Sequence, residues 1–298
     1  MITLLDGSMG QELMNRSAAT PPPLWALQVM MDHPHLVEEI HRDYFNAGAL
    51  VATTNTYNIL PDRLKLHGDP SMLAAYQHQA IDAAHRARDA HGSGVIAGAI
   101  GPLGGSYMPE TETPSERIAE IYAPIVAIQA PRVDVILFET IASVNHAEGA
   151  LMAAEAAGKP VWLGVTVEDR DGTKLRSGED LALIPQNADA LLINCALPEA
   201  VTEATAALKP SIPLGAYANG FTEIVEAFLH TAQTVDALAA RDDLGPAAYT
   251  DHALRWIANG ATIVGGCCEI GPAHIAHLAN ALIAEGHALA TDLPARAA

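Results

Sequence analysis

The chain has few basic residues and no long apolar run, and each shortage excludes a class of protein. Only 16 of its 298 residues are Lys or Arg, against 35 Asp or Glu, so the formal net charge is −19. So acidic a surface repels phosphate groups, which argues against nucleic acids and anionic membranes as partners. No uninterrupted apolar segment reaches the roughly 18–20 residues needed to cross a bilayer. Because no basic segment followed by an apolar one opens the chain, we expect a cytoplasmic location.

Cysteine is also scarce. The three cysteines are Cys195, Cys267 and Cys268. An odd number with two adjacent members is a poor framework for disulfides, and a reducing compartment would disfavour them further. These thiols therefore need another explanation.

Half of the residues are hydrophobic, and the apolar segments are short and separated by longer amphipathic stretches. Several of the short segments are apolar throughout, which is typical of parallel strands buried on both faces. The predicted strands are Thr3–Asp6, Leu50–Asn55, Val95–Ile100, Val133–Glu139, Val161–Val167, Ala190–Cys195, Pro213–Tyr217 and Thr262–Gly265.

The stretches between the strands predict helices. The clearest are His35–Ala47, Ser71–His91, Pro114–Ala130, Asn145–Ala157 and Pro272–Glu285, while those after the fifth and sixth strands are weak.

Eight strands alternating with helices predict an α/β fold, a single (β/α)8 TIM barrel over residues 1–298. The acidic segment Phe221–Leu244 is either an excursion over the barrel mouth or a plain helical insertion, and residues 291–298 are predicted to be a disordered tail.

The chemically distinctive residues follow the carboxyl ends of the predicted strands, and we call this edge of the barrel the carboxyl rim. In (β/α)8 barrels the active site is built there. Cys195 ends the sixth strand, and the Cys267-Cys268 pair follows the eighth. Because these strand ends lie on one face two places apart, the three thiols can converge on one point.

Three thiolates leave a tetrahedral zinc ion one position short, which is the pattern of a catalytic rather than a structural site. Sulfur ligands favour zinc over magnesium or calcium. Gly265-Gly266 would let the backbone bend to present consecutive cysteines. The alternatives are a Cys195 that is only a small buried hydrophobe, and a Cys267-Cys268 pair that forms a vicinal disulfide or arises by chance.

Ten sequence motifs, taken in order along the chain, resemble the homocysteine S-methyltransferase family, which includes the betaine–homocysteine and S-methylmethionine–homocysteine methyltransferases. The segments that carry the resemblance are Leu4–Leu13, Pro23-Leu24-Trp25, His35–Ala47, Thr53–Tyr57, Gly98–Pro102, Phe138-Glu139-Thr140, Asn194-Cys195, Tyr217-Ala218-Asn219, Gly265–Cys268 and the helix opened by Pro272. The sequence departs from the family at Ser8, where many members have glycine, and at Glu269-Ile270-Gly271. These departures leave the three cysteines intact but bear on substrate selectivity.

The resemblance implies a homocysteine-binding barrel with zinc held by Cys195, Cys267 and Cys268. It also implies that Glu139 accepts the ammonium of homocysteine with support from Asp6. On the residues alone, Glu139 is equally interpretable as a buried ion-pair partner and Asp6 as a turn residue.

The resemblance further places the Gly7–Ser8 backbone near the carboxylate of homocysteine, and Thr54 in contact with the substrate.

The expected activity is transfer of a methyl group from a sulfonium donor, S-methylmethionine or S-adenosylmethionine, to homocysteine, giving methionine. Coordination to zinc releases the thiol proton, so no side-chain base is required. Aromatic faces suit a cationic donor, which makes Trp25, Tyr57 and Tyr107 candidates, although ordinary loop packing explains each of them as well. The alternatives are betaine as donor, another small thiol or selenol as acceptor, and a zinc- or thiol-binding protein without turnover.

Overall fold

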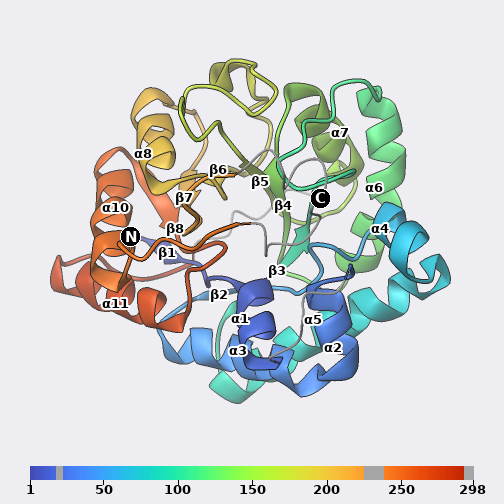
Figure 1. Ribbon diagram of the computed structural model, residues 1–298, viewed down its shortest axis with the longest axis horizontal. Helices are drawn as coiled ribbons and strands as arrows, with labels where there is room; N and C mark the ends of the chain where they lie inside the picture. Colours follow the sequence, from blue (N-terminus) through green and yellow to red (C-terminus); the bar gives the residue numbers. More distant parts are fainter. Residues whose placement is uncertain (18–22, 225–237, 292–298) are drawn as a thin grey trace.

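The computed structural model describes residues 1–17, 23–224 and 238–291, and within them eight parallel strands form a barrel surrounded by helices (Figure 1). The order around the sheet is β1-β8-β7-β6-β5-β4-β3-β2. The strands are β1 (Thr3–Leu4), β2 (Val51–Thr53), β3 (Val95–Ile100), β4 (Val135–Ile141), β5 (Val161–Val165), β6 (Ala190–Asn194), β7 (Leu214–Tyr217) and β8 (Ala261–Val264). A parallel bridge between Leu5 and Val51, with the Leu50 amide donating to the Leu4 carbonyl at 2.8 Å, joins β1 to β2. The predicted (β/α)8 barrel is confirmed.

Helices occupy the outside of the barrel in the order expected from the sequence. They are α1 (Met9–Ser17), α2 (Ala26–Asp32), α3 (Pro34–Asn46), α4 (Pro61–His67), α5 (Leu73–His91), α6 (Ser115–Gln129), α7 (Val144–Ala154), α8 (Pro198–Ala207), α10 (Pro246–Ala258) and α11 (Pro272–Ala284), with short 3-10 helices η1 (Pro70–Met72) and η2 (Leu181–Leu183). The five clearest predicted helices are confirmed. The short helices α1, α2 and α4, of 9, 7 and 7 residues, were not predicted, because two turns show little periodicity.

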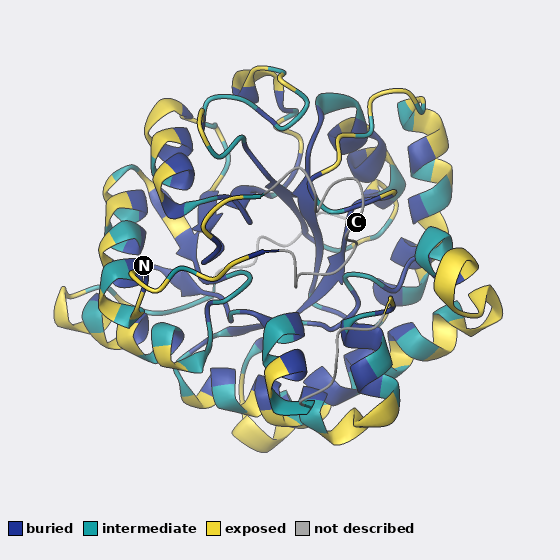
Figure 2. Ribbon diagram, viewed as in Figure 1, coloured by how far each residue is buried: buried dark blue, intermediate teal, exposed yellow. Residues whose placement is uncertain are grey.

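The buried core has two layers, inside the strands and between strands and helices (Figure 2). Side chains alternate between the layers, as the two-residue period of a strand requires. In β4, Val135 and Leu137 point into the barrel, while Ile136 and Phe138 pack against the helices. Glu139 is two residues beyond Leu137, so the same alternation directs its carboxyl into the barrel interior.

The predicted end of the fourth strand was wrong by two residues, because β4 continues through Glu139 to Ile141. The pairing with β5 shifts register between Phe138 and Ile141, and Thr140 has a φ of 60°. Such an irregularity re-aims a side chain without ending the strand. Asn194 of β6 holds it, accepting from the Thr140 amide at 3.0 Å and donating to the Thr140 hydroxyl at 3.1 Å.

The weakly predicted helix after β5 is not formed. Between β5 and β6 the only helix is the three-residue η2, and isolated bridges join Val167 to Leu175 and Lys174 to Asp180. The helix predicted after the sixth strand is present as α8.

The acidic segment Phe221–Leu244 leaves and rejoins the barrel at one place. Phe221 bridges to Ala240, and the Arg241 amide donates to the Gly220 carbonyl at 2.8 Å. Residues 225–237 lie outside the described part, so the choice between an excursion and a helical insertion is not tested. The predicted tail, apart from Thr291, also lies outside the described residues.

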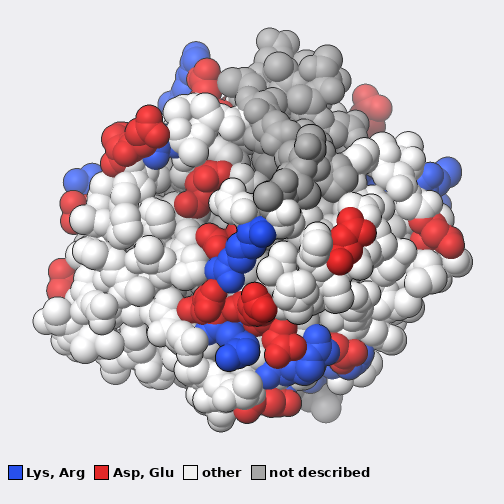
Figure 3. Space-filling view, turned by 60° about the horizontal axis from the view of Figure 1, so that its bottom comes forward, with Lys and Arg blue, Asp and Glu red and all other residues white. Residues whose placement is uncertain are grey.

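Charged side chains on the surface are mixed in sign. Figure 3 shows one face, on which acidic and basic side chains of the described residues stand side by side. Arg16, for example, contacts both Glu12 at 3.0 Å and Asp43 at 2.7 Å. Among the residues described, no helix combines the length and apolar character needed to span a membrane.

Candidate active site

A cavity opens at the carboxyl rim, and all eleven residues singled out from the sequence line it. They are Asp6, Gly7, Ser8, Trp25, Thr54, Tyr57, Tyr107, Glu139, Cys195, Cys267 and Cys268. They come from strands and loops spread over the whole chain, so the barrel is what brings them together.

The three thiols form one cluster. The Cys195 sulfur lies 2.9 Å from the Cys267 sulfur and 3.8 Å from the Cys268 sulfur, and all three lie within 4.8 Å of one another. Cys195 is buried, and Cys267 and Cys268 are partly exposed to the cavity. The predicted convergence of β6 and β8 is therefore observed.

Backbone contacts among the rim loops fix where the cysteines point. Cys195 has a φ of 51°, and its carbonyl accepts from the Asn219 side-chain amide at 2.9 Å. The Cys267 amide donates to the Ala218 carbonyl at 3.0 Å, and the Gly220 amide donates to the Cys268 carbonyl at 2.8 Å. The loop after β7 thus holds both halves of the cluster.

The two glycines before Cys267 leave out side chains for which there is no room where the backbone presents the cysteines. Neither has a positive φ. A Cβ on Gly265 would lie 2.5 Å from the Leu5 Cβ, and one on Gly266 would lie 2.3 Å from Ile270. Side chains there would push β1 and the loop after Cys268 away from the thiols.

The three thiols titrate as a group. Burial opposes ionisation of Cys195, but hydrogen bonds from Cys267, Cys268 and Tyr107 outweigh it and hold the pKa of Cys195 well below its usual value. Their hydrogen bonds to Cys195 raise the pKa values of Cys267 and Cys268. The hydrogen bonds among the sulfurs thus favour ionisation of Cys195 over that of Cys267 and Cys268, and a metal ion would favour ionisation of all three.

Glu139 is a buried carboxyl with one protein partner at its tip. The Tyr217 hydroxyl donates to Glu139 Oε1 at 2.9 Å. Burial raises the pKa of Glu139 to about 8, although the hydrogen bond from Tyr217 opposes the shift. The groups that influence this carboxyl among the described residues are Tyr217, Asp6 and Cys195, none of them a cation, so the interpretation of Glu139 as half of a structural ion pair is not supported.

Asp6 is the second buried carboxyl. It accepts from the Thr53 amide at 2.6 Å and from the Thr53 hydroxyl at 2.7 Å, and burial raises its pKa to about 7. Thr54 points elsewhere, since its hydroxyl accepts from the Ala99 amide at 3.1 Å and bonds to Thr56. The Ser8 amide is also engaged, because it donates to the Ile270 carbonyl at 2.9 Å.

The three aromatic candidates differ in their contacts. The Tyr57 hydroxyl bonds to Ser106 at 2.8 Å, and the Tyr107 hydroxyl lies 3.0 Å from the Cys195 sulfur. Trp25 lies over Gly10, where a Cβ would come within 2.2 Å of the indole ring. Its buried Nε1 has no hydrogen-bond partner among the described residues.

Several residues in or beside the cavity were not identified as site residues from the sequence. Thr53, Tyr217 and Asn194 position the two carboxyls and the β4 irregularity, and their places at strand ends were the available signal. Arg63 of α4 is the one Lys or Arg among the described residues that line the cavity. No local pattern marks it, because it lies in an unpredicted helix.

Over most of its length the chain is similar to proteins named as methyltransferases. A homocysteine S-methyltransferase of Escherichia coli is 30% identical over 93% of this chain and 94% of its own length. A selenocysteine methyltransferase of Astragalus bisulcatus is 25% identical over 90% of this chain and 89% of its own. The metallated form of the homocysteine methyltransferase MmuM from Escherichia coli superposes with a TM-score of 0.78 at 28% identity, covering 94% of this chain and 96% of that one.

Fold, site and relatives together define a methyltransferase built on a (β/α)8 barrel. The family model described as Homocysteine S-methyltransferase matches residues 3–282. The chain belongs to the homocysteine S-methyltransferase family.

Proposed function

We propose that the protein transfers a methyl group from a sulfonium donor, S-methylmethionine or S-adenosylmethionine, to the thiol of homocysteine, giving methionine, with zinc held by Cys195, Cys267 and Cys268. The observation that carries the proposal is the convergence of these thiols in a cavity that also holds two buried carboxyls. The relatives named for homocysteine and the metallated form of MmuM support it.

The cluster fits a zinc ion. Tetrahedral zinc with bonds of about 2.3 Å to sulfur separates neighbouring sulfurs by roughly 3.8 Å. The Cys195–Cys268 distance is 3.8 Å, and the 2.9 Å between Cys195 and Cys267 has to widen by about 0.9 Å, the difference from the spacing around zinc. Three protein sulfurs leave a fourth position for the substrate thiol. When bound, zinc supplies the charge that lets a thiol lose its proton while its sulfur stays nucleophilic.

The amino-acid end of homocysteine meets the buried carboxyls. Glu139, aimed into the cavity and oriented by Tyr217, accepts the ammonium, and Asp6 adds a second negative charge. The carboxylate of homocysteine is received by the Gly7 backbone and the Ser8 hydroxyl, and the support for this is that both residues line the same cavity. Thr54 shapes the cavity wall rather than offering a free hydroxyl.

The methyl transfer is a single displacement. A bond forms between the homocysteine sulfur and the methyl carbon, and the bond from that carbon to the donor sulfonium breaks, with its electron pair passing to the donor sulfur. The proton of the acceptor thiol leaves to solvent. Because a thiolate and a sulfonium give two less charged sulfurs, a cavity that excludes water lowers the barrier.

The cavity walls suit a cationic donor that carries a carboxylate. Trp25, Tyr57 and Tyr107 offer aromatic faces to the sulfonium. Trp25 Nε1 is buried without a hydrogen-bond partner among the described residues, and so is Arg63 Nε, which lies 3.7 Å from the Asp62 carboxylate. Either nitrogen could donate to an acceptor such as the carboxylate of the donor.

A second candidate acceptor is a selenol. It is favoured by the selenocysteine methyltransferase of Astragalus bisulcatus among the relatives, and the same cluster would activate selenium. Betaine as donor, another small thiol as acceptor and zinc binding without turnover are less well supported, the last because a simple metal site has no use for two buried carboxyls.

The test is the metal content and activity of Cys267→Ala. We expect about one zinc per chain in the unaltered protein, and loss of both zinc and methionine formation in the variant. S-methylmethionine, S-adenosylmethionine and betaine would be compared as donors, each with homocysteine and with selenocysteine. Full activity of the metal-free variant would refute the mechanism, and a preference for selenocysteine would change only the acceptor.

A further inference from the structure

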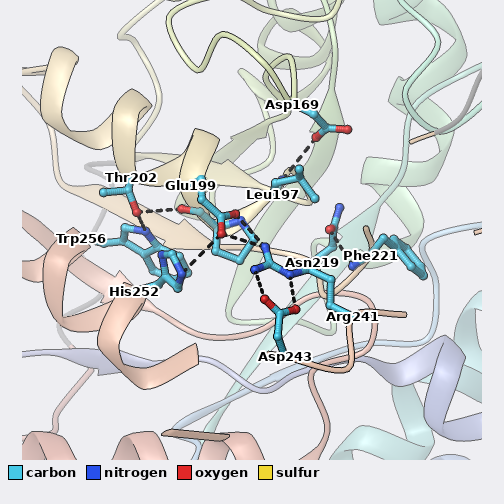
Figure 4. Close-up of polar contacts among 11 residues, drawn as sticks. Asp169, Leu197, Glu199, Thr202, Asn219, Phe221, Arg241, Asp243, His252 and Trp256 are labelled. Carbon is cyan, nitrogen blue, oxygen red and sulfur yellow. Dashed lines mark hydrogen bonds and ion pairs between the residues drawn. The ribbon is translucent and has the colours of Figure 1, made fainter. Parts of the chain in front are cut away.

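The loop between β5 and β6, which lacks the expected helix, contributes a buried ion pair beside the thiols. Arg176 Nη2 lies 2.7 Å from Asp169 Oδ1, and the two side chains are only 8% and 10% exposed. Asp169 is held in turn, because it accepts from the Leu197 amide at 3.3 Å and the Ile224 amide at 3.0 Å (Figure 4 shows the first of these contacts). Leu197 is two residues beyond Cys195, so the pair is tied to the loop that carries that ligand.

Arg176 covers the face of Tyr107. Its guanidinium carbon is 4.9 Å from the ring centroid, within the range of a cation–π contact. Tyr107 is 4% exposed and has a φ of 65°, a backbone conformation that persists in a non-glycine residue only when the surroundings enforce it. The hydroxyl group at the far end of the same ring lies 3.0 Å from the Cys195 sulfur.

A second path joins Arg176 to Cys195. Arg176 Nε donates to the Thr166 hydroxyl at 3.4 Å, and that hydroxyl donates to the Cys195 carbonyl at 3.3 Å. Arg176 is therefore linked to the Cys195 sulfur through Tyr107 and to the Cys195 carbonyl through Thr166.

We propose that Arg176 is a positioning residue, which holds the Tyr107 hydroxyl as a hydrogen-bond donor to the Cys195 sulfur and so stabilises this thiolate as a metal ligand. A hydrogen bond to a charged sulfur is stronger than one between neutral groups, and it keeps the ligand in one orientation. The planar guanidinium is suited to the task, since it stacks on the ring while its nitrogens bond to Asp169 and Thr166. This inference rests on the proposed metal site.

The test uses zinc-loaded full-length protein and the variants Tyr107→Phe, Arg176→Lys and their combination. Lysine keeps the charge beside Asp169 but cannot stack as a plane. Zinc affinity is measured by competition with a coloured chelator. We expect each single variant to weaken it by about 10–100-fold, the usual effect of losing a partner of a metal ligand. Since Arg176 acts mainly through Tyr107, the loss of zinc affinity in the double variant should be smaller than the sum of the losses in the two single variants.

Arg170→Lys is the matched control, because Arg170 is in the same loop, is 92% exposed and contacts Glu223 at 3.6 Å. Its zinc affinity should equal that of the unaltered protein. A second readout is the sulfur-to-metal absorption of cobalt-loaded protein, which should shift in Tyr107→Phe and Arg176→Lys but not in Arg170→Lys.

Unchanged zinc affinity in Arg176→Lys, or additive losses of zinc affinity in the double variant, would overturn the inference. Neither result would contradict the proposed metal site. An unaltered protein that binds no zinc would instead remove the proposed function as well. Should Tyr107→Phe fail to fold, the cobalt spectrum of Arg176→Lys decides alone, and an unshifted spectrum counts against the inference.

Discussion

At the scale of single residues, Glu139 shows how a costly burial becomes useful. Inside the barrel no cation offsets the cost of burying a charge, so burial favours the uncharged form of this carboxyl and raises its pKa to about 8. In the proposed function, an arriving ammonium would supply the missing charge, and the carboxyl would ionise as the ligand binds. The group thus remains uncharged when the cavity is empty at neutral pH.

A first prediction concerns this carboxyl. Methionine has no thiol proton to lose, so its binding isolates the ammonium contact. We expect the affinity of the unaltered protein for methionine, measured by calorimetry, to rise as pH rises from 6 to 8, by up to about tenfold per unit. Glu139→Gln should bind methionine more weakly. Its affinity should also depend less steeply on pH, because only the ionisation of Asp6 then contributes. If the affinity of both proteins depended on pH equally steeply, the ammonium would be bound by a group other than Glu139.

At the scale of elements, the site depends on how β4, β5, β6 and β7 meet. Gly164 of β5 lies between their side chains, where a Cβ would come 3.0 Å from the Tyr217 hydroxyl and 3.1 Å from Asn194 Oδ1. It would also come 2.9 Å from the Phe138 carbonyl. The missing side chain leaves room for the two groups that orient Glu139 and the β4 irregularity.

A second prediction is that Gly164→Ala disturbs both groups at once. Overpacking of a filled interior costs about 1–3 kcal/mol, so we expect that loss in the free energy of unfolding together with a raised KM for homocysteine. Gly245→Ala is the control, because no atom lies within 4 Å of its added Cβ and its φ is −70°. Equal behaviour of the two variants in denaturant unfolding and in KM would contradict the packing argument.

At the scale of the whole molecule, folding buries two carboxyls that the unfolded chain exposes to water. Burial raises the pKa of Asp6 from 3.8 to about 7 and that of Glu139 from 4.5 to about 8. The folded state therefore holds these protons more tightly than the unfolded state does. The stability they contribute is complete below about pH 4 and is lost as pH rises through about 7 and 8.

A third prediction follows for the metal-free protein. Between pH 5 and pH 8, each of the two carboxyls should lower the free energy of unfolding by at most about 4 kcal/mol. Asp6→Asn and Glu139→Gln should each flatten this dependence. The control is Asp89→Asn, since that side chain is 67% exposed beside Arg88. Variants whose pH dependence in urea titrations equals that of the unaltered protein would contradict the argument.

Much of the fold was predictable because buried parallel strands must be apolar. The segment Val95–Ile100 is predicted and observed with the same bounds. The fourth strand was misjudged at Glu139, since a charged residue ordinarily ends an apolar strand, and only the contact of Asn194 with Thr140 shows why it continues. The loop after β5 carries no periodic pattern, so nothing local marked Arg176.

The sequence by itself determined the barrel, through the alternation of apolar and amphipathic segments, and the chemistry of its rim, through the residue types that follow the strands. The tertiary structure decided which of these groups meet. The distance between Cys195 and Cys267, the contact of Arg176 with Tyr107 and the desolvation of Glu139 all depend on side chains from different strands. Local patterns along a chain carry no such distances, because closure of the barrel creates them.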